Sequence, residues 1–190
     1  MADVVISRFP DLPRPDAPGP IAVVRDFVNT DDRETGVDRL VTAAGLTAYL
    51  QEEGLLQGSV RASRRDLDQA LELRAVLRAA LVAHHDGRSD PITGLGAAVE
   101  RLEVHLTWSE DGPRLEPRRP GVQAALARIG IAAHEAARDG TWPRLKICSS
   151  DACEWAYFDH SKNQSRRWCE YGCGNRAKSR ALRARRRAAT

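Results

Sequence analysis

The sequence predicts a mainly α-helical fold, in which a helical N-terminal domain with a small β-hairpin is followed by a cysteine-rich segment and a basic C-terminal helix. Three observations predict it. Apolar residues recur with the spacing of one helix face in 64–87 and in 120–140. Apolar and polar residues alternate in 102–108, as in a half-buried strand. All four cysteines lie within 148–173, and arginines at helical spacing follow them.

The 190 residues are 42% apolar, which is enough to bury a core. The chain has no run of apolar residues long enough to span a bilayer and no export signal at its start, so we expect a cytoplasmic protein that is not bound to a membrane. The net charge of +3 is unevenly distributed, because 1–143 carries 17 basic and 22 acidic residues whereas 144–190 carries 12 and 4. Arginine outnumbers lysine 26 to 3, which is typical of a GC-rich genome and alone says nothing about function.

The first elements are marked by proline and by helix caps. Residues 1–20 are expected to be a flexible lead-in because 8–20 is rich in proline, and the apolar segment 21–28 is too short to assign from its period. Thr42 is expected to cap a helix that ends at Gly54. Ser63 and Asp66 form a capping box, which predicts a helix that continues to Gly87. His84 lies on its apolar stripe and is expected to be buried and hydrogen-bonded.

The rest of the body contains one further short helix, the hairpin and a long helix. Asp90 and Pro91 are expected to open the short helix, and 102–108 to form a strand that turns at 109–113 and returns through Leu115. Pro120 is expected to begin a helix that continues to Gly140. The body, 21–141, has no phosphate-binding loop, nucleophile elbow or paired-histidine motif, so we do not expect an enzyme.

The cysteines are arranged as two pairs, Cys148-x4-Cys153 and Cys169-x3-Cys173, which are 15 residues apart. Two short chelating loops joined by a hairpin supply the four ligands that zinc needs in a closed tetrahedral site. We therefore expect one structural zinc ion, with an iron–sulfur cluster and competition from His160 as alternatives. Aromatic residues in 155–158 are expected to form a short strand between the pairs. Nearby basic residues are expected to offset the charge of the four thiolates: Lys146, Arg166, Arg167 and Arg176.

A basic helix is expected directly after the last cysteine. It would begin at Gly174 and Asn175 and continue through Arg187, about 22 Å of helix. Its arginines form one stripe, at Arg176, Arg180, Arg183 and Arg187. Binding to a polyanion is the direct use of such a stripe, and a solvated, frayed tail is the alternative.

The cysteine-rich segment resembles the CGNR zinc-finger family, which is named for the tetrad that stands here at 173–176. The resemblance also includes Phe158 and Asp159, the sequence SRRWC at 165–169 and CGNRAK at 173–178. Upstream, RDFVNT at 25–30 and GLTAYLQEEGLL at 45–56 resemble the ABATE domain that precedes this finger in many bacterial proteins. Three departures stand out: the second cysteine pair has three intervening residues where four are usual, Glu154 stands where glycine is common, and Arg25 stands where an apolar residue usually precedes DFVNT.

The resemblance implies a bacterial, often actinobacterial, transcription regulator. A treble-clef-like zinc finger at 142–190 would bind double-stranded DNA, and the helical domain at 21–141 would sense a stress signal or small ligand or hold a dimer together. It makes Cys148, Cys153, Cys169 and Cys173 the zinc ligands. The basic motif positions are Arg166, Arg167, Asn175, Arg176 and Lys178, while Arg180, Arg183, Arg185, Arg186 and Arg187 follow only the family's basic tendency. Candidate contacts to a small-molecule effector are Arg25, Asn29 and Thr30, with exposure on a helix end as the alternative for Arg25 and local capping as the alternative for Asn29 and Thr30.

The basic helix suggests how DNA would be contacted. Arg183 to Arg187 would bind phosphates, and residues near the zinc end, Asn175 and Arg176 with Lys178 or Arg180, would read base edges. Because one finger offers few base contacts, we expect a homodimer on a repeated half-site. The alternatives are an RNA-binding protein and a redox switch in which oxidation of the thiolates releases zinc.

Overall fold

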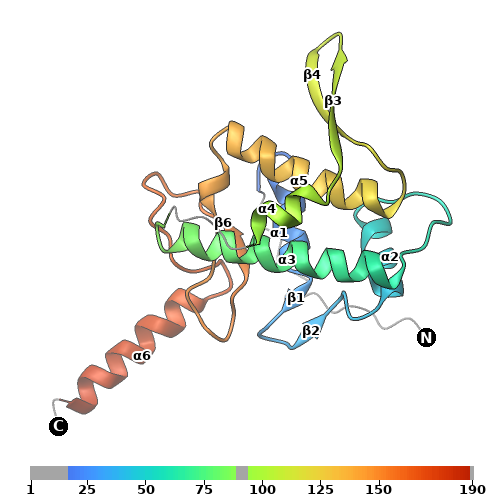
Figure 1. Ribbon diagram of the computed structural model, residues 1–190. Helices are drawn as coiled ribbons and strands as arrows, with labels where there is room; N and C mark the ends of the chain where they lie inside the picture. Colours follow the sequence, from blue (N-terminus) through green and yellow to red (C-terminus); the bar gives the residue numbers. More distant parts are fainter. Residues whose placement is uncertain (1–16, 89–93, 189–190) are drawn as a thin grey trace.

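The computed structural model describes residues 17–88 and 94–188 (Figure 1). The fold is mainly helical, as expected. Helices α1 (Ile21–Val28), α3 (Arg64–His85) and α5 (Val122–Arg138) pack together at its centre. The strands of the described residues form three separate two-stranded antiparallel sheets. Residues 1–16 of the lead-in expected at 1–20 lie outside the described residues, as do Asp90 and Pro91, which were expected to open a helix.

The segment 21–28, which the sequence left unassigned, is a helix because it is enclosed on nearly every side. Val24, Phe27 and Val28 of α1 are fully buried. The chain then forms the small hairpin of β1 (Asp31–Asp32) and β2 (Val37–Asp38). It continues into α2 (Ala43–Glu52), where the Thr42 hydroxyl accepts a hydrogen bond from the Gly45 N–H and caps the helix as expected.

Helices α3 and α5 supply most of the remaining core. The capping box of Ser63 and Asp66 is confirmed at the start of α3, and α4 (Leu95–Glu100) is a short helix after it. His84, near the end of α3, is half-buried and donates from Nδ1 to the Leu145 carbonyl at 3.0 Å, so the expected hydrogen bond is confirmed. The buried face of α5 includes Leu126 and Ile129, which are fully enclosed.

The expected hairpin consists of β3 (Val104–Ser109) and β4 (Gly112–Pro117), and it projects from the body (Figure 1). Alternation of apolar residues on a strand is typical of a face that packs on a core. Here the apolar side lies in solvent, with Leu106 65% exposed and Trp108 79% exposed.

The C-terminal segment begins with the single turn η1 (Trp142–Arg144) and the strand β5 (Leu145–Ile147). This strand pairs with β6 (Ala156–Phe158), which confirms the strand expected at 155–158; its partner β5 was not expected from the sequence. Side chains of both strands join the core of the body: Leu145, Ile147, Ala156 and Phe158. The final helix, α6 (Cys173–Ala188), extends from this sheet into solvent at the opposite end of the molecule from the β3–β4 hairpin (Figure 1).

Candidate metal centre and basic helix

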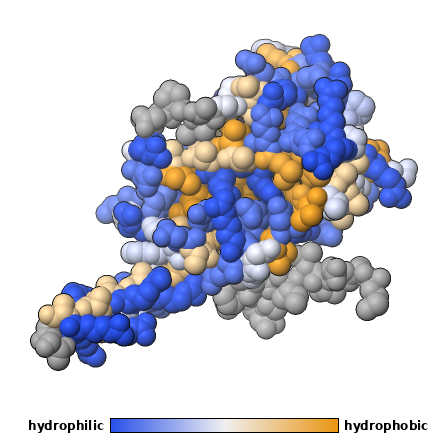
Figure 2. All heavy atoms as spheres, turned by 60° about the horizontal axis from the view of Figure 1, so that its bottom comes forward, coloured by the Kyte–Doolittle hydropathy of each residue, from blue (hydrophilic) through white to orange (hydrophobic). Residues whose placement is uncertain are grey.

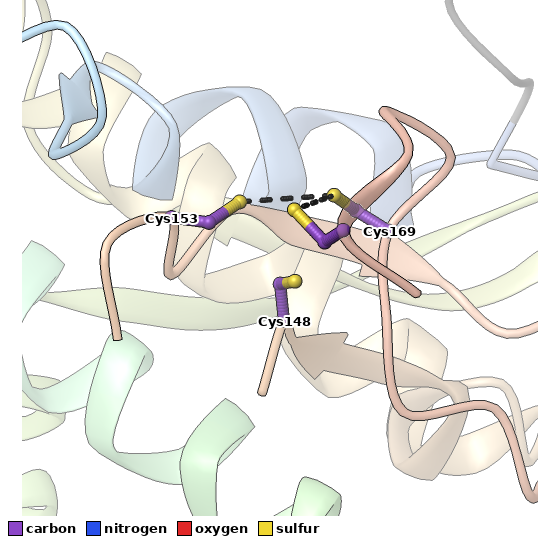
Figure 3. Close-up of side chains that lie close together, drawn as sticks. Cys148, Cys153 and Cys169 are labelled. Carbon is purple, nitrogen blue, oxygen red and sulfur yellow. Dashed lines mark hydrogen bonds between the residues drawn. The ribbon is translucent and has the colours of Figure 1, made fainter. Parts of the chain in front are cut away.

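The four cysteines meet at one point beside the β5–β6 sheet. Cys148 directly follows β5, Cys153 ends the first loop, Cys169 follows the second loop and Cys173 begins α6. All four are buried, and their sulfur atoms lie within 4.8 Å of one another. In Figure 3 the labelled sulfur atoms point toward a common centre.

The geometry fits a single tetrahedral ion. The Cys153 and Cys169 sulfurs are 3.7 Å apart, as are those of Cys169 and Cys173. Zinc–sulfur bonds of about 2.3 Å in a tetrahedron separate the ligands by about 3.8 Å. A cluster of several irons would have to hold the four thiolates further apart. His160 is exposed and packs its ring edge on Phe158, outside the sulfur group. The four cysteines therefore form a zinc-binding site for one structural ion.

Backbone hydrogen bonds shape the loops that carry the sulfurs. The Cys148 N–H donates to the Trp155 carbonyl and the Ser149 N–H to the Arg167 carbonyl, each at 2.9 Å, so the two loops are held together. The shortened second pair closes through Gly172, whose φ of +77° lies in the region that glycine favours. Glu154 has a φ of +45°, which explains why glycine is common at this position in the family it resembles.

Charge around the sulfurs favours a bound cation. A hydrogen bond with Cys153 is the main reason that the pKa of the Cys148 thiol is raised, to about 11, and hydrogen bonds with Cys148 and Cys153 likewise raise the pKa of the Cys169 thiol. Four ionised thiolates in so small a volume need a dication. The Arg176 guanidinium donates to the Cys173 sulfur at 2.8 Å, which adds a second positive group to the site.

A buried ion pair between Lys146 and Asp159 stabilises the second loop, which connects β6 to Cys169. Asp159 is fully buried, and one of its carboxylate oxygens accepts from Lys146 at 2.8 Å. The other accepts from the hydroxyl and N–H of Ser161, and the Arg166 N–H donates to the first. Burial alone would raise the pKa of Asp159, but these donors outweigh it and lower the pKa to about 2. The carboxylate therefore stays ionised and fixes the chain that leads to Cys169.

Arg166, which was expected to contact DNA, is turned toward the finger itself. Its guanidinium donates to the Trp168 carbonyl, pairs with Glu170 at 2.8 Å and lies over the ring of Tyr157. Tyr157 in turn donates its hydroxyl to the Arg166 carbonyl at 2.6 Å. Arg167, in contrast, is exposed.

The remaining basic positions lie on α6, which has one buried residue, Cys173. Figure 2 shows the helix projecting from the body with a hydrophilic side and a paler apolar side. Exposed side chains along it include all the other expected DNA contacts: Asn175, Lys178, Arg180, Arg183, Arg185, Arg186 and Arg187. Arg176 is half-exposed, but it is engaged by Cys173 and pairs with Glu34 of the body at 3.4 Å.

Buried polar side chains of the body form hydrogen bonds with the backbone of the finger. The Asn29 side chain donates to the Ala156 carbonyl at 2.9 Å and accepts from the Ala156 N–H at 2.7 Å. Arg78 of α3 donates to the carbonyls of Glu154, Val28 and Asp31 at 2.9–3.0 Å. Burial is the main cause that lowers the pKa of Arg78. The finger is thus fixed by groups far away in the sequence.

The three candidate effector contacts lie at this joint. Arg25 pairs with its neighbour Asp26 at 2.9 Å, and the Thr30 hydroxyl donates to the Phe27 carbonyl and accepts from Arg74. Arg25 and Asn29 line a crevice of about 20 Å³ beside β6, which has room for about one water molecule. An effector role for these residues remains a prediction.

Sequence reasoning missed the two buried arginines of α3. Arg78 holds the finger, and Arg74 makes two bonds of 2.7 Å to the carboxylate of Asp38. A signal was present, because both arginines lie at helical spacing on the same stripe as Leu67 and Leu81. Arginine on a buried stripe indicates a paired or carbonyl-bound guanidinium.

Comparison with known families agrees with this architecture. Residues 22–140 match the ABATE family model, described as "Putative stress-induced transcription regulator", and residues 144–186 match the CGNR zinc finger. Both are families of regulators and zinc fingers rather than of enzymes. No curated protein matches the chain. None of the helices in the described residues is both long and apolar enough to cross a membrane.

Proposed function

The chain belongs to the ABATE family, and from this premise we propose that it is a transcription regulator whose zinc-held basic helix binds double-stranded DNA. The family supports a regulator; DNA binding is our inference from the C-terminal segment. The observation that carries it is the exposed helix α6, which contains seven basic residues, no acidic residue and no packed face beyond its first turn.

Binding to a polyanion is the direct physical use of a helix of this kind. Its 16 residues extend about 24 Å, enough to lie along a groove of a duplex. Seven positive charges lie close together along α6, with Arg176 paired to Glu34 of the body, and binding to phosphates would relieve their mutual repulsion while releasing counterions. Cys173 makes the first turn of the helix part of the metal site, so bound zinc would fix the direction in which α6 leaves the finger.

The positions on α6 suggest a division of roles. Arg183 and the triplet 185–187, far from the zinc, would bind phosphates and position the helix. Asn175, Lys178 and Arg180, near the rigid end, are the candidates for reading base edges. Arg176 would have to break its contacts with Cys173 and Glu34 before it could reach DNA. We therefore assign it to the metal site and to the contact between finger and body rather than to DNA binding.

The body would then act as a sensor or dimerisation module. We propose a homodimer, because a single finger offers few base contacts. An effector that displaced α1 would move Asn29 and, through its two hydrogen bonds, strand β6 of the finger. Arg25, Asn29 and Thr30 are proposed as the residues through which such a signal reaches the zinc finger.

A competition experiment tests the nucleic-acid class. The zinc-loaded chain is bound to a fluorescent 30-base-pair DNA duplex at fixed salt, and unlabelled DNA or RNA duplexes are added as competitors. We expect DNA to compete better, and we expect chelation of zinc to abolish specific binding in a selection of genomic fragments. Stronger competition by RNA would replace the transcription proposal with the RNA-binding alternative.

A further inference from the structure

One face of the β3–β4 hairpin is apolar on both strands. The register pairs Val104 with Pro117, Leu106 with Leu115 and Trp108 with Pro113. Since residues opposite one another in an antiparallel pair share a face, these six residues form one surface, which we call the ribbon face. The other face carries polar pairs, such as Thr107 with Arg114.

The side of the ribbon face that belongs to β3 is exposed to solvent. Trp108 is 79% exposed and Leu106 is 65% exposed, and they lie next to one another on the same side of β3. Exposed apolar patches of this kind mark interaction sites, and a short hairpin with two open edges invites pairing with another chain.

The ribbon face continues into a groove on the body. Leu115 and Pro117 also line an open cavity of about 750 Å³, the size of a cavity that accommodates large apolar groups. Its apolar lining, which we call the groove, comes from α1, α2's C-terminal loop and α5: Val23, Leu55, Ala124, Ile131 and Ala132. Charged side chains border it, with Arg118, Arg119 and Arg128 against Glu116 and Glu135.

The tip of the hairpin is complementary to this groove. Glu110 and Asp111 occupy the turn, where Asp111 pairs with Arg114, so the arm is apolar along one face and carries the carboxylate of Glu110 at its end. The apolar residues of the groove are bordered by three arginines and two glutamates, and of these Arg119 already pairs with Glu103. A single chain therefore carries, side by side, an arm and a recess of matching chemistry.

We propose that the ribbon face and the groove form a self-association surface, in which the hairpin of each of two copies lies in the groove of the other. Because the arm adjoins its own groove, a two-fold axis between two chains places both arms at once and closes the assembly. Trp108 is the anchor, a residue type that dominates interfaces when it fills a pocket. The hairpin projects away from α6, so both basic helices remain accessible (Figure 1).

This inference supplies the interface for the homodimer of the proposed function and in that respect rests on it. The two can fail separately. Self-association is measured without nucleic acid, so a monomer would remove the interface and leave DNA binding to be judged by its own experiment.

Sedimentation velocity of the zinc-loaded full chain tests the proposal. We expect a dimer at micromolar concentration, and we expect Trp108→Ser to weaken association by tenfold or more. The matched control is Val41→Ser, because Val41 is 70% exposed and lies outside the ribbon face and the groove. A monomeric parent chain, or a dimer that Trp108→Ser leaves unchanged, would overturn the proposal.

A charge exchange tests the reciprocal arrangement. Glu110→Arg and Arg118→Glu should each weaken self-association, since each places like charges in both contacts of the dimer. Mixing the two variants should restore a dimer, because both contacts then join opposite charges. If the mixture stays monomeric while the parent chain is dimeric, the arm does not lie in the partner's groove.

Discussion

The side chain of Asn29 forms two hydrogen bonds with the backbone of Ala156, donating to its carbonyl and accepting from its N–H. The two residues are 127 positions apart, one in the helical body and one in the strand that supports the zinc site. Strand β6 pairs with one strand in its sheet, β5. Asn29 therefore supplies hydrogen bonds to the edge of β6 that does not face β5.

Asn29→Ala should destabilise the whole chain, because it leaves two buried backbone groups of Ala156 unpaired. Each such group costs about 1–3 kcal/mol, so we expect a loss of about 3 kcal/mol in the free energy of unfolding. Urea titration of the zinc-loaded chain measures it. Asn163→Ala, at an exposed position of the finger, is the control. A loss no greater than that of the control would show that the joint does not depend on Asn29.

Arg176→Gln should weaken zinc binding by about tenfold, because it removes the guanidinium that donates to the Cys173 sulfur. Competition with a chromophoric chelator measures zinc affinity directly. Arg180→Gln removes the same charge one turn further along α6, away from the sulfurs, and should leave zinc affinity unchanged. If both variants lost zinc affinity equally, the effect of Arg176 would come from its charge alone and not from its hydrogen bond to Cys173.

Asp159→Asn should lower the stability of the finger at neutral pH. The pKa of Asp159 in the folded chain, about 2, lies below its ordinary value of 3.8, so the ionised carboxylate favours the folded state. This contribution, about 2 kcal/mol, is complete above about pH 5 and is lost progressively as the pH falls through 2 toward 1. Urea titrations of the parent chain and the variant should therefore differ by the full amount at pH 7, by about half as much at pH 3, and converge only as the pH falls toward 1. Asp151→Asn removes an exposed carboxylate from the first loop of the finger and should show no difference from the parent chain at pH 7.

Local sequence signals predicted the helices and the cysteine site well. The capping box at Ser63, the cap at Thr42 and the hairpin after residue 101 depend on neighbouring residues, and all three are confirmed. The four cysteines converge because their paired spacing leaves little other geometry for the loops between them. The resemblance to the two families is likewise confirmed.

The joint between body and finger could not be predicted in the same way. Strand β5 has three residues, too few for any periodicity, and it forms because β6 and α3 cover it. In the sequence, nothing close to Arg78 distinguishes it from the other arginines of the body, because the carbonyls that it binds are 47 to 76 positions away. The exposure of Trp108 could not be predicted from the sequence either. An alternating pattern shows which residues share a face, but it does not show whether another element packs against that face.

The most direct test of the central claim is the salt dependence with which the zinc-loaded chain binds a mixed-sequence DNA duplex. If α6 contacts about five phosphates, the logarithm of the association constant should fall with the logarithm of salt concentration with a slope of about −4 to −5. Arg183→Gln with Arg187→Gln should weaken binding and reduce that slope by about 2, whereas Arg61→Gln with Arg65→Gln, exposed on the body, should change neither. A slope near zero, or an equal loss in the body variant, would contradict DNA binding by the zinc-held helix.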